Sequence, residues 1–123
     1  MTQILSVGTS LPPHRVDQDE VMAFVGGFFR ESYPDIDRLL KVFHNGQIQS
    51  RHLSVPLEWF NTKHSLQEKN DLYIKISVEL GIEAIRHCLN DSGFWERDIH
   101  YEEVDAIFYV STTGFSTPSI EAK

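Results

Sequence analysis

Hydrophobic positions along the chain form short strand-like runs separated by helical stripes. Residues 4–9 are apolar and end in a glycine-containing turn, which predicts a buried strand. Residues 48–55 partly alternate and predict a strand or extended segment. Residues 104–110 are almost continuously apolar, as in a central strand that is covered on both faces. A polar turn at 111–114 follows, and Pro118 then predicts the first turn of another helix.

The first helix is expected after Asp17, because Glu20 three residues later has the spacing of a capping box. Apolar residues recur at helical spacing over 21–29 and form one stripe. Gly26 and Gly27 weaken this helix by roughly 1 kcal/mol each relative to alanine. A tertiary contact must therefore hold it.

Two further helices follow. Asp35 is placed to cap the second helix, and Gly46 is expected to end it in the left-handed conformation. Ser65 and Glu68 form another capping-box spacing at the start of the third. Residues 72–89 carry two adjacent apolar stripes, which predict a helix buried between layers. That helix is expected to end at Asn90, Asp91 and Gly93.

Composition limits the class of protein. The 123 residues carry a formal net charge of −7, so nucleic acid is not an expected partner. Cys88 is the single cysteine, which leaves no internal disulfide and favours a reducing compartment. No secretory signal and no membrane-spanning run is visible, and the six histidines are not at metal-ligand spacing. We expect a cytoplasmic protein with no membrane insertion and no metal site.

Three segments in order along the chain resemble a known family. They are residues 4–12 (ILSVGTSLP), 46–52 (GQIQSRH) and 110–119 (VSTTGFSTPS). Together they are similar to the N-terminal part of chalcone synthase-like type III polyketide synthases, most of all to bacterial members that make alkylpyrones. The resemblance covers essentially the whole chain, and three motifs in register are more specific than any one alone.

The resemblance implies an α/β fold, the incomplete N-terminal half of a thiolase-like layered fold, with residues 1–123 as one domain truncated before the catalytic cysteine. It implies a homodimeric acyltransferase that condenses an acyl-CoA starter with malonyl-CoA, without a permanently bound cofactor. In the family a cysteine thiolate attacks the thioester, and a histidine and an asparagine stabilise the enolate from malonyl-CoA. These three residues follow Lys123 in the family's order, so no catalytic residue is assigned and the chain alone is expected to be inactive.

Two basic residues are candidates for CoA binding. By the resemblance, Arg38 and Lys41 fall at positions whose relatives contact CoA phosphates. They are three residues apart, so on a helix both cations face the same way and are suited to clamp a pyrophosphate or a ribose phosphate. Plant members have a third basic residue where this chain has Asn45. The alternative is a solvated charged face, with Asp35 and Asp37 as ion-pair partners.

Three threonines are candidates for the substrate cavity and the dimer interface. By the resemblance, Thr112 and Thr113 match the turn beside the family's acyl cavity. Thr117 matches a position that reaches across the dimer interface, where plant members carry methionine, so a differently shaped cavity wall is implied. The alternative for Thr112 and Thr113 is an ordinary strand-to-helix turn, in which small hydroxyl residues are common.

Cys88 is not expected to be a nucleophile. It directly follows His87, and adjacent residues on a helix point about 100° apart, so the two side chains cannot pair. It also lies near the C-terminal end of the predicted helix, where the helix dipole disfavours a thiolate. We interpret Cys88 as a structural thiol.

Two other functions stay open on the sequence alone. A ketoacyl-ACP synthase III-type fatty-acid condensing enzyme shares the fold, and it matches the motifs more loosely than the polyketide branch does. A stand-alone, non-catalytic α/β module is the alternative from a different class. Such a module would cover its central strand and cap its last helix.

Overall fold

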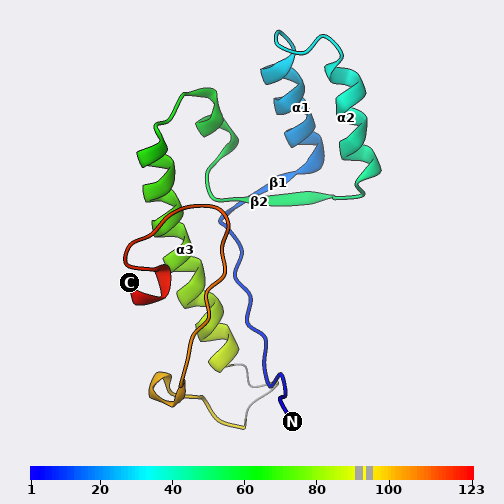
Figure 1. Ribbon diagram of the computed structural model, residues 1–123. Coiled ribbons are helices and arrows are strands. Elements are labelled where there is room, and N and C mark those ends of the chain that lie inside the picture. The colour runs from blue at the N-terminus through cyan, green and yellow to red at the C-terminus, as the bar shows by residue number, and fades with distance from the viewer. Residues whose placement is uncertain (91–92, 94–95) are drawn as a thin grey trace. The chain divides into compact units, whose positions relative to one another are not determined.

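The computed structural model describes residues 1–90, 93 and 96–123, and its helices and strands are labelled in Figure 1. The chain divides into two compact units, which we name by their helices. The two-helix unit is Pro12–Lys63. The long-helix unit joins Met1–Leu11 to His64–Lys123.

The two-helix unit combines a strand pair with two helices. Its elements in order are β1 (His14–Asp17), α1 (Gln18–Phe29), α2 (Ile36–Asn45), β2 (Ser50–Leu53) and a short 3-10 helix (Leu57–Asn61). The strands are antiparallel, with His14 opposite Leu53. Both predicted helices and the extended character of residues 48–55 are confirmed. β1 lies where the hydrophobic pattern predicts no strand.

A small core holds the two-helix unit together. Its buried apolar side chains are Val16, Val21, Ile36 and Val55. Gly26 is also buried, and an added Cβ at this position would lie 3.2 Å from the Leu40 Cδ1 on α2. This close approach of the two helices is the tertiary contact that a glycine inside α1 requires. At the start of α1, the Glu20 carboxylate accepts the Asp17 backbone N–H at 3.1 Å, as the capping spacing predicts.

The end of α2 differs from the prediction. Asp35 precedes the helix as expected, but Gly46 has φ −72° and remains right-handed. Its backbone N–H donates to the Val42 carbonyl at 3.0 Å, which continues the helical turn. The left-handed residue is Gln47, with φ 53°, so the chain reverses one residue later than predicted.

The long-helix unit is built on α3 (Leu66–Leu89). Its predicted capping box is confirmed, because the Ser65 Oγ accepts the Glu68 N–H at 3.1 Å and the Glu68 carboxylate accepts the Ser65 N–H at 2.7 Å. Asn90 follows the helix, and the predicted end residue Asp91 lies outside the described residues. The helix predicted at Pro118 is only a 3-10 turn (Ile120–Ala122), and another such turn is Tyr101–Glu103.

The prediction of two strands in this unit is wrong. Residues 4–9 and 104–110 are extended but are not paired as strands, and both run along α3 (Figure 1). A strand needs a neighbour to bond its backbone groups. In the described part of the chain the β1–β2 pair is the only sheet, and it belongs to the other unit.

The N-terminal segment is held to α3 by polar contacts and by a glycine. The Ser6 hydroxyl donates to the Cys88 carbonyl at 2.7 Å, and the His87 Nδ1 lies 2.8 Å from the Thr9 carbonyl oxygen. Gly8 lies directly against the helix backbone, where an added Cβ would collide with the Ala84 carbonyl oxygen. The apolar residues of this segment, such as Val7, remain exposed.

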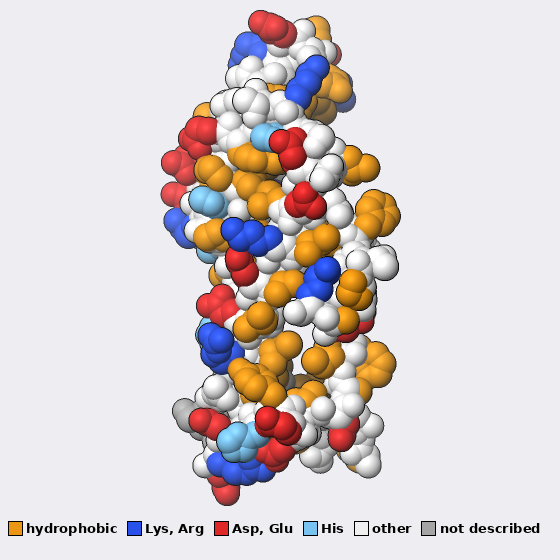
Figure 2. All heavy atoms as spheres, turned by 90° about the vertical axis from the view of Figure 1, so that its left-hand side faces the viewer, with side chains coloured by type: hydrophobic (Ala, Val, Ile, Leu, Met, Phe, Trp, Pro, Cys, Tyr) orange, Lys and Arg blue, Asp and Glu red, His pale blue; other side chains and the backbone are white. Residues whose placement is uncertain are grey.

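The helix α3 is not buried between layers, contrary to the prediction. None of its residues is buried, and Ile82 is 51% exposed. In the facing segment Phe108 is 91% and Val110 is 90% exposed. Figure 2 shows hydrophobic side chains gathered on the surface of this unit. The apolar pattern is therefore present without the layers that would cover it.

We predict that Gly8→Ala destabilises the long-helix unit, because the new methyl group forces the backbone of residues 4–9 away from α3. Overpacking of this kind costs about 1–3 kcal/mol. The matched control is Gly81→Ala in α3, where an added Cβ meets nothing within 4 Å. The control should gain about 1 kcal/mol from helix propensity. Urea unfolding followed by far-UV circular dichroism measures both, and equal stabilities for the two variants would contradict the contact.

Candidate functional site

The residues expected to contact CoA lie on α2 in the two-helix unit. Arg38 and Lys41 are both exposed, and they stand three residues apart in a continuous helix. Residues at this spacing are neighbours on one helical face. The same helix buries Ile36, which fixes it to the core of the unit. The fold therefore presents both cations to solvent side by side.

The carboxylates near these cations are not paired with them. Asp37 forms an ion pair with Arg30 at 3.4 Å, and both side chains are largely exposed. Within the described residues no carboxylate forms an ion pair with Arg38 or Lys41. Asp35 stands at the N-terminal cap of α2 without a side-chain bond to it. The two cations remain available to an anionic ligand.

The three candidate threonines lie in the long-helix unit. Thr112, Thr113 and Thr117 are all exposed, and the first two share one turn. The Thr113 N–H donates to the Ser111 hydroxyl at 3.4 Å, which tightens that turn. They belong to a different unit from Arg38 and Lys41.

Asn70 anchors this turn and is a residue that the motif search misses. Its Nδ2 donates to the Phe115 carbonyl at 2.9 Å, and its Oδ1 accepts the Phe115 N–H at 2.8 Å. One amide side chain on α3 thus satisfies both backbone groups of Phe115, as a neighbouring strand would. The sequence offers one indication of this role, which is that an asparagine lies inside a predicted helix. Asparagine has a poor helix propensity, so a tertiary contact is a reason for its presence there.

Gly114 gives the turn a second anchor on α3. An added Cβ there would lie 2.6 Å from the Tyr73 Cγ, so only glycine lets the backbone approach this ring. The Tyr73 hydroxyl lies 3.4 Å from the Tyr109 hydroxyl. Hydrogen bonds from Ser77 and Tyr73 lower the pKa of the Tyr109 phenol. The hydroxyls of Tyr73 and Ser77 on α3 therefore lie close to that of Tyr109, just before the turn in the chain.

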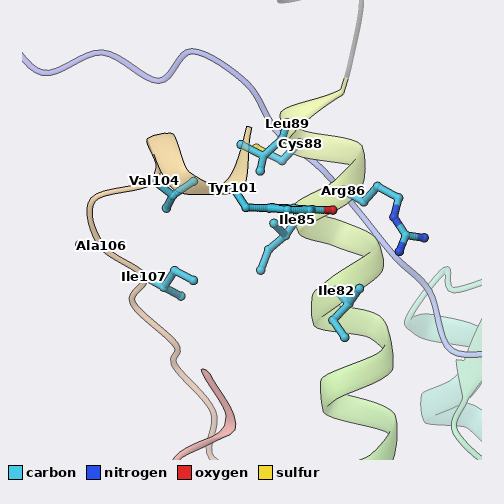
Figure 3. A pocket seen from close by; sticks show the side chains of 9 residues that line it. All are labelled: Ile82, Ile85, Arg86, Cys88, Leu89, Tyr101, Val104, Ala106 and Ile107. Carbon is cyan, nitrogen blue, oxygen red and sulfur yellow. The ribbon is translucent and has the colours of Figure 1, made fainter. Parts of the chain in front are cut away.

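An apolar hollow of about 630 Å³ lies farther along α3 (Figure 3). Ile82, Ile85 and Leu89 line it from α3, and Val104 and Ile107 line it from the facing segment. In Figure 3 the Tyr101 side chain extends toward α3, whereas the Arg86 guanidinium points away from Val104 and Ile107. Most of the lining side chains are apolar, and the Tyr101 hydroxyl and the Cys88 thiol are the polar or reactive groups among those that line the hollow beside Arg86. The hollow is part of the uncovered surface of the unit.

Cys88 also lines this hollow and is not in a disulfide. The ring of the adjacent His87 is directed to the Thr9 carbonyl, so this histidine is not the thiol's base. Among the described residues no three side chains form a group that could hold a metal ion. No helix in the described ranges is long and apolar enough to cross a membrane.

We predict that Asn70→Ala loosens the turn that carries Thr112 and Thr113. Both bonds to Phe115 are lost, and each is worth about 0.5–1.5 kcal/mol. Hydrogen exchange of the Phe115 amide should therefore accelerate by about tenfold. Lys69→Ala is the matched control, since its exposed side chain lies next to Asn70 on α3. An unchanged Phe115 exchange rate in Asn70→Ala would show that the side chain does not hold the turn.

Comparison with known proteins connects this geometry to a family. No protein-family model matches the chain. The chain is 48% identical over 123 residues to a chalcone synthase-like protein of Bacillus subtilis (strain 168), covering 100% of this chain and 34% of that protein. It is 26% identical over 122 residues to a 1,3,6,8-tetrahydroxynaphthalene synthase of Streptomyces peucetius subsp. caesius, covering 99% of this chain and 31% of that protein.

A solved structure shares the fold. The crystal structure of 1,3,6,8-tetrahydroxynaphthalene synthase from Streptomyces coelicolor A3(2), a bacterial type III polyketide synthase, matches with a TM-score of 0.76 and 22% identity. The match covers 95% of this chain and 33% of that one, which confirms an incomplete thiolase-like fold. The chain spans about a third of the length of these relatives. Along its whole length the chain is similar to chalcone synthase-like and other type III polyketide synthases, over one part of their length.

Proposed function

We propose that this chain is the part of a type III polyketide synthase that binds the phosphates of CoA substrates. The observation that carries the proposal is the pair of exposed cations, Arg38 and Lys41, on one face of α2. CoA carries a diphosphate and a ribose phosphate, and charge-assisted bonds to phosphate are about twice as strong as neutral ones. The similarity along the whole chain to relatives of this family supports the same assignment.

The turn of the long-helix unit has a separate role in this proposal. Thr112 and Thr113 would line the cavity that holds the acyl chain, and Thr117 would reach across the interface of a homodimer. The exposure of all three and the anchoring of their turn by Asn70 support these roles. A threonine in place of a larger side chain at position 117 leaves room for a long acyl group.

The proposed reaction is a decarboxylative Claisen condensation between an acyl-CoA and malonyl-CoA. A cysteine thiolate attacks the acyl thioester and releases CoA. Malonyl-CoA then loses CO2, and its enolate attacks the enzyme-bound acyl group and frees the thiolate. The proposal places the nucleophile and its partners outside this chain and assigns Cys88 no catalytic role. Acyl-CoA-dependent release of CO2 from malonyl-CoA by the product of the whole gene tests the reaction class.

We predict that Arg38→Ala combined with Lys41→Ala weakens CoA binding by this chain. Each cation contributes about 1.5–3 kcal/mol to a charged hydrogen bond, so the dissociation constant should rise by at least about tenfold. An NMR titration that follows the backbone amides of α2 measures the constant directly. The effect should shrink as salt is added, because exposed charges are screened.

The control removes the same two positive charges elsewhere. Lys63→Ala combined with Lys75→Ala leaves α2 intact, and both of these side chains are exposed. This variant should bind CoA as the unmodified chain does. Equal CoA affinities for the α2 variant and the unmodified chain would refute the phosphate-binding role.

A further inference from the structure

Gln18 joins α1, α2 and β2 in the two-helix unit. Its side chain is only 7% exposed, although it is polar. The Nε2 group donates to the Phe43 carbonyl at 3.2 Å, and the Oε1 atom accepts the Arg51 Nε–H at 3.1 Å. Its backbone N–H donates to the Gln49 carbonyl at 2.9 Å. Every one of these bonds reaches a different part of the unit from the helix that Gln18 begins.

The bond to Phe43 caps the end of α2. The last four carbonyls of a helix have no partner within the helix. In α2 the Val42 carbonyl accepts the Gly46 N–H at 3.0 Å, and the His44 carbonyl accepts the Gln47 N–H at 3.4 Å. The Phe43 carbonyl, which lies between them in the chain, accepts the hydrogen bond from the Gln18 Nε2 group. A side chain from the start of α1 thus completes the C-terminal turn of α2.

This cap matters because α2 is short and is buried at its other end. A helix of ten residues is marginal by itself. Its buried residue is Ile36 in the first turn, whereas Val42 in the last turn is exposed. The last turn is held through Phe43, whose ring lies 5.8 Å from the Arg51 guanidinium carbon. Gln18 bonds both the Phe43 carbonyl and the Arg51 side chain, so both of its side-chain bonds stabilise the C-terminal end of α2.

We propose that Gln18 is a positioning residue for the CoA-binding face of α2, an inference that rests on the proposed function. Without its cap, the C-terminal half of the helix frays, and Lys41 no longer keeps its place beside Arg38. A ligand with several phosphates gains from two cations at a fixed spacing, because less freedom is lost on binding. A single inorganic phosphate needs one cation and is indifferent to that spacing.

The test compares Gln18→Met with Gln49→Met. Methionine has a similar length and no charge, so both bonds of the Gln18 side chain are lost. The Gln49 side chain is exposed, and its backbone carbonyl, which accepts the Gln18 N–H, is kept in the control. NMR titrations with CoA and with inorganic phosphate give two dissociation constants for each variant. For Gln18→Met we expect about a tenfold rise for CoA and no change for phosphate.

Amide exchange and a second variant at position 18 complete the test. Amide exchange at Gly46 and Gln47 should accelerate in Gln18→Met, because these groups form the turn that the cap holds. Should circular dichroism show that Gln18→Met is unfolded, Gln18→Glu replaces it, since glutamate keeps the acceptor for Arg51 and loses the donor for Phe43. The expected results are then the same.

Several results would overturn the inference. Unchanged CoA affinity in Gln18→Met, beside lost affinity in the Arg38→Ala and Lys41→Ala variant, removes the role of Gln18 and leaves the proposed function standing. Equal weakening for CoA and phosphate indicates general damage and also removes a positioning role. Retained CoA affinity in the double variant removes the proposed function, and the inference with it.

Discussion

An extended backbone finds most of its hydrogen-bond partners in a neighbouring strand, and two extended apolar segments of the long-helix unit have no such strand. Residues 4–9 and 104–110 run along α3 without forming a sheet. Many of their apolar side chains are left exposed, as Phe108 illustrates, and those of α3 are at most half-buried. The two-helix unit differs because its strands pair with each other. It buries a core of its own, whereas Ile120 is the only buried apolar residue among those that the structure describes in the long-helix unit.

Two side-chain amides form hydrogen bonds with backbone groups that have no partner in a sheet or helix. Asn70 bonds both backbone groups of Phe115, and Gln18 bonds the open carbonyl of Phe43. Each side chain lies on a helix and fixes the segment that carries a candidate binding group. The candidate phosphate contacts on α2 and the candidate cavity turn are therefore each held by one amide. This arrangement links the fold to the proposed acyltransferase role more closely than the exposed residues alone do.

The sequence predicts helices here better than it predicts strands, and the reason is physical. A capping box such as Ser65 with Glu68 is local, so its geometry follows from residues three positions apart. An apolar run such as 104–110 becomes a strand only when distant residues pair with it. The end of α2 is predicted one residue too early for a different, local reason, because the Gly46 N–H still bonds the Val42 carbonyl and the left-handed residue is Gln47.

In the candidate site too, local geometry is predictable from the sequence and long-range contacts are not. The spacing of Arg38 and Lys41 predicts a shared helical face, since it depends only on helix geometry. Their role in CoA binding comes from the family resemblance and remains a prediction. Asn70 and Gln18 are not found by motif reading, because each acts on backbone atoms 45 and 25 residues away in the chain. Nothing in the hydrophobic pattern records such a contact.

Amide hydrogen exchange over residues 106–110, followed by NMR on the 123-residue chain, tests the central claim most directly. If these residues lack strand partners, their amides should exchange at nearly the rate of an unstructured peptide, while amides in the middle of α3 are protected. Protection of the 106–110 amides by a factor of about a thousand or more would show that they are paired in a sheet, and would contradict the account.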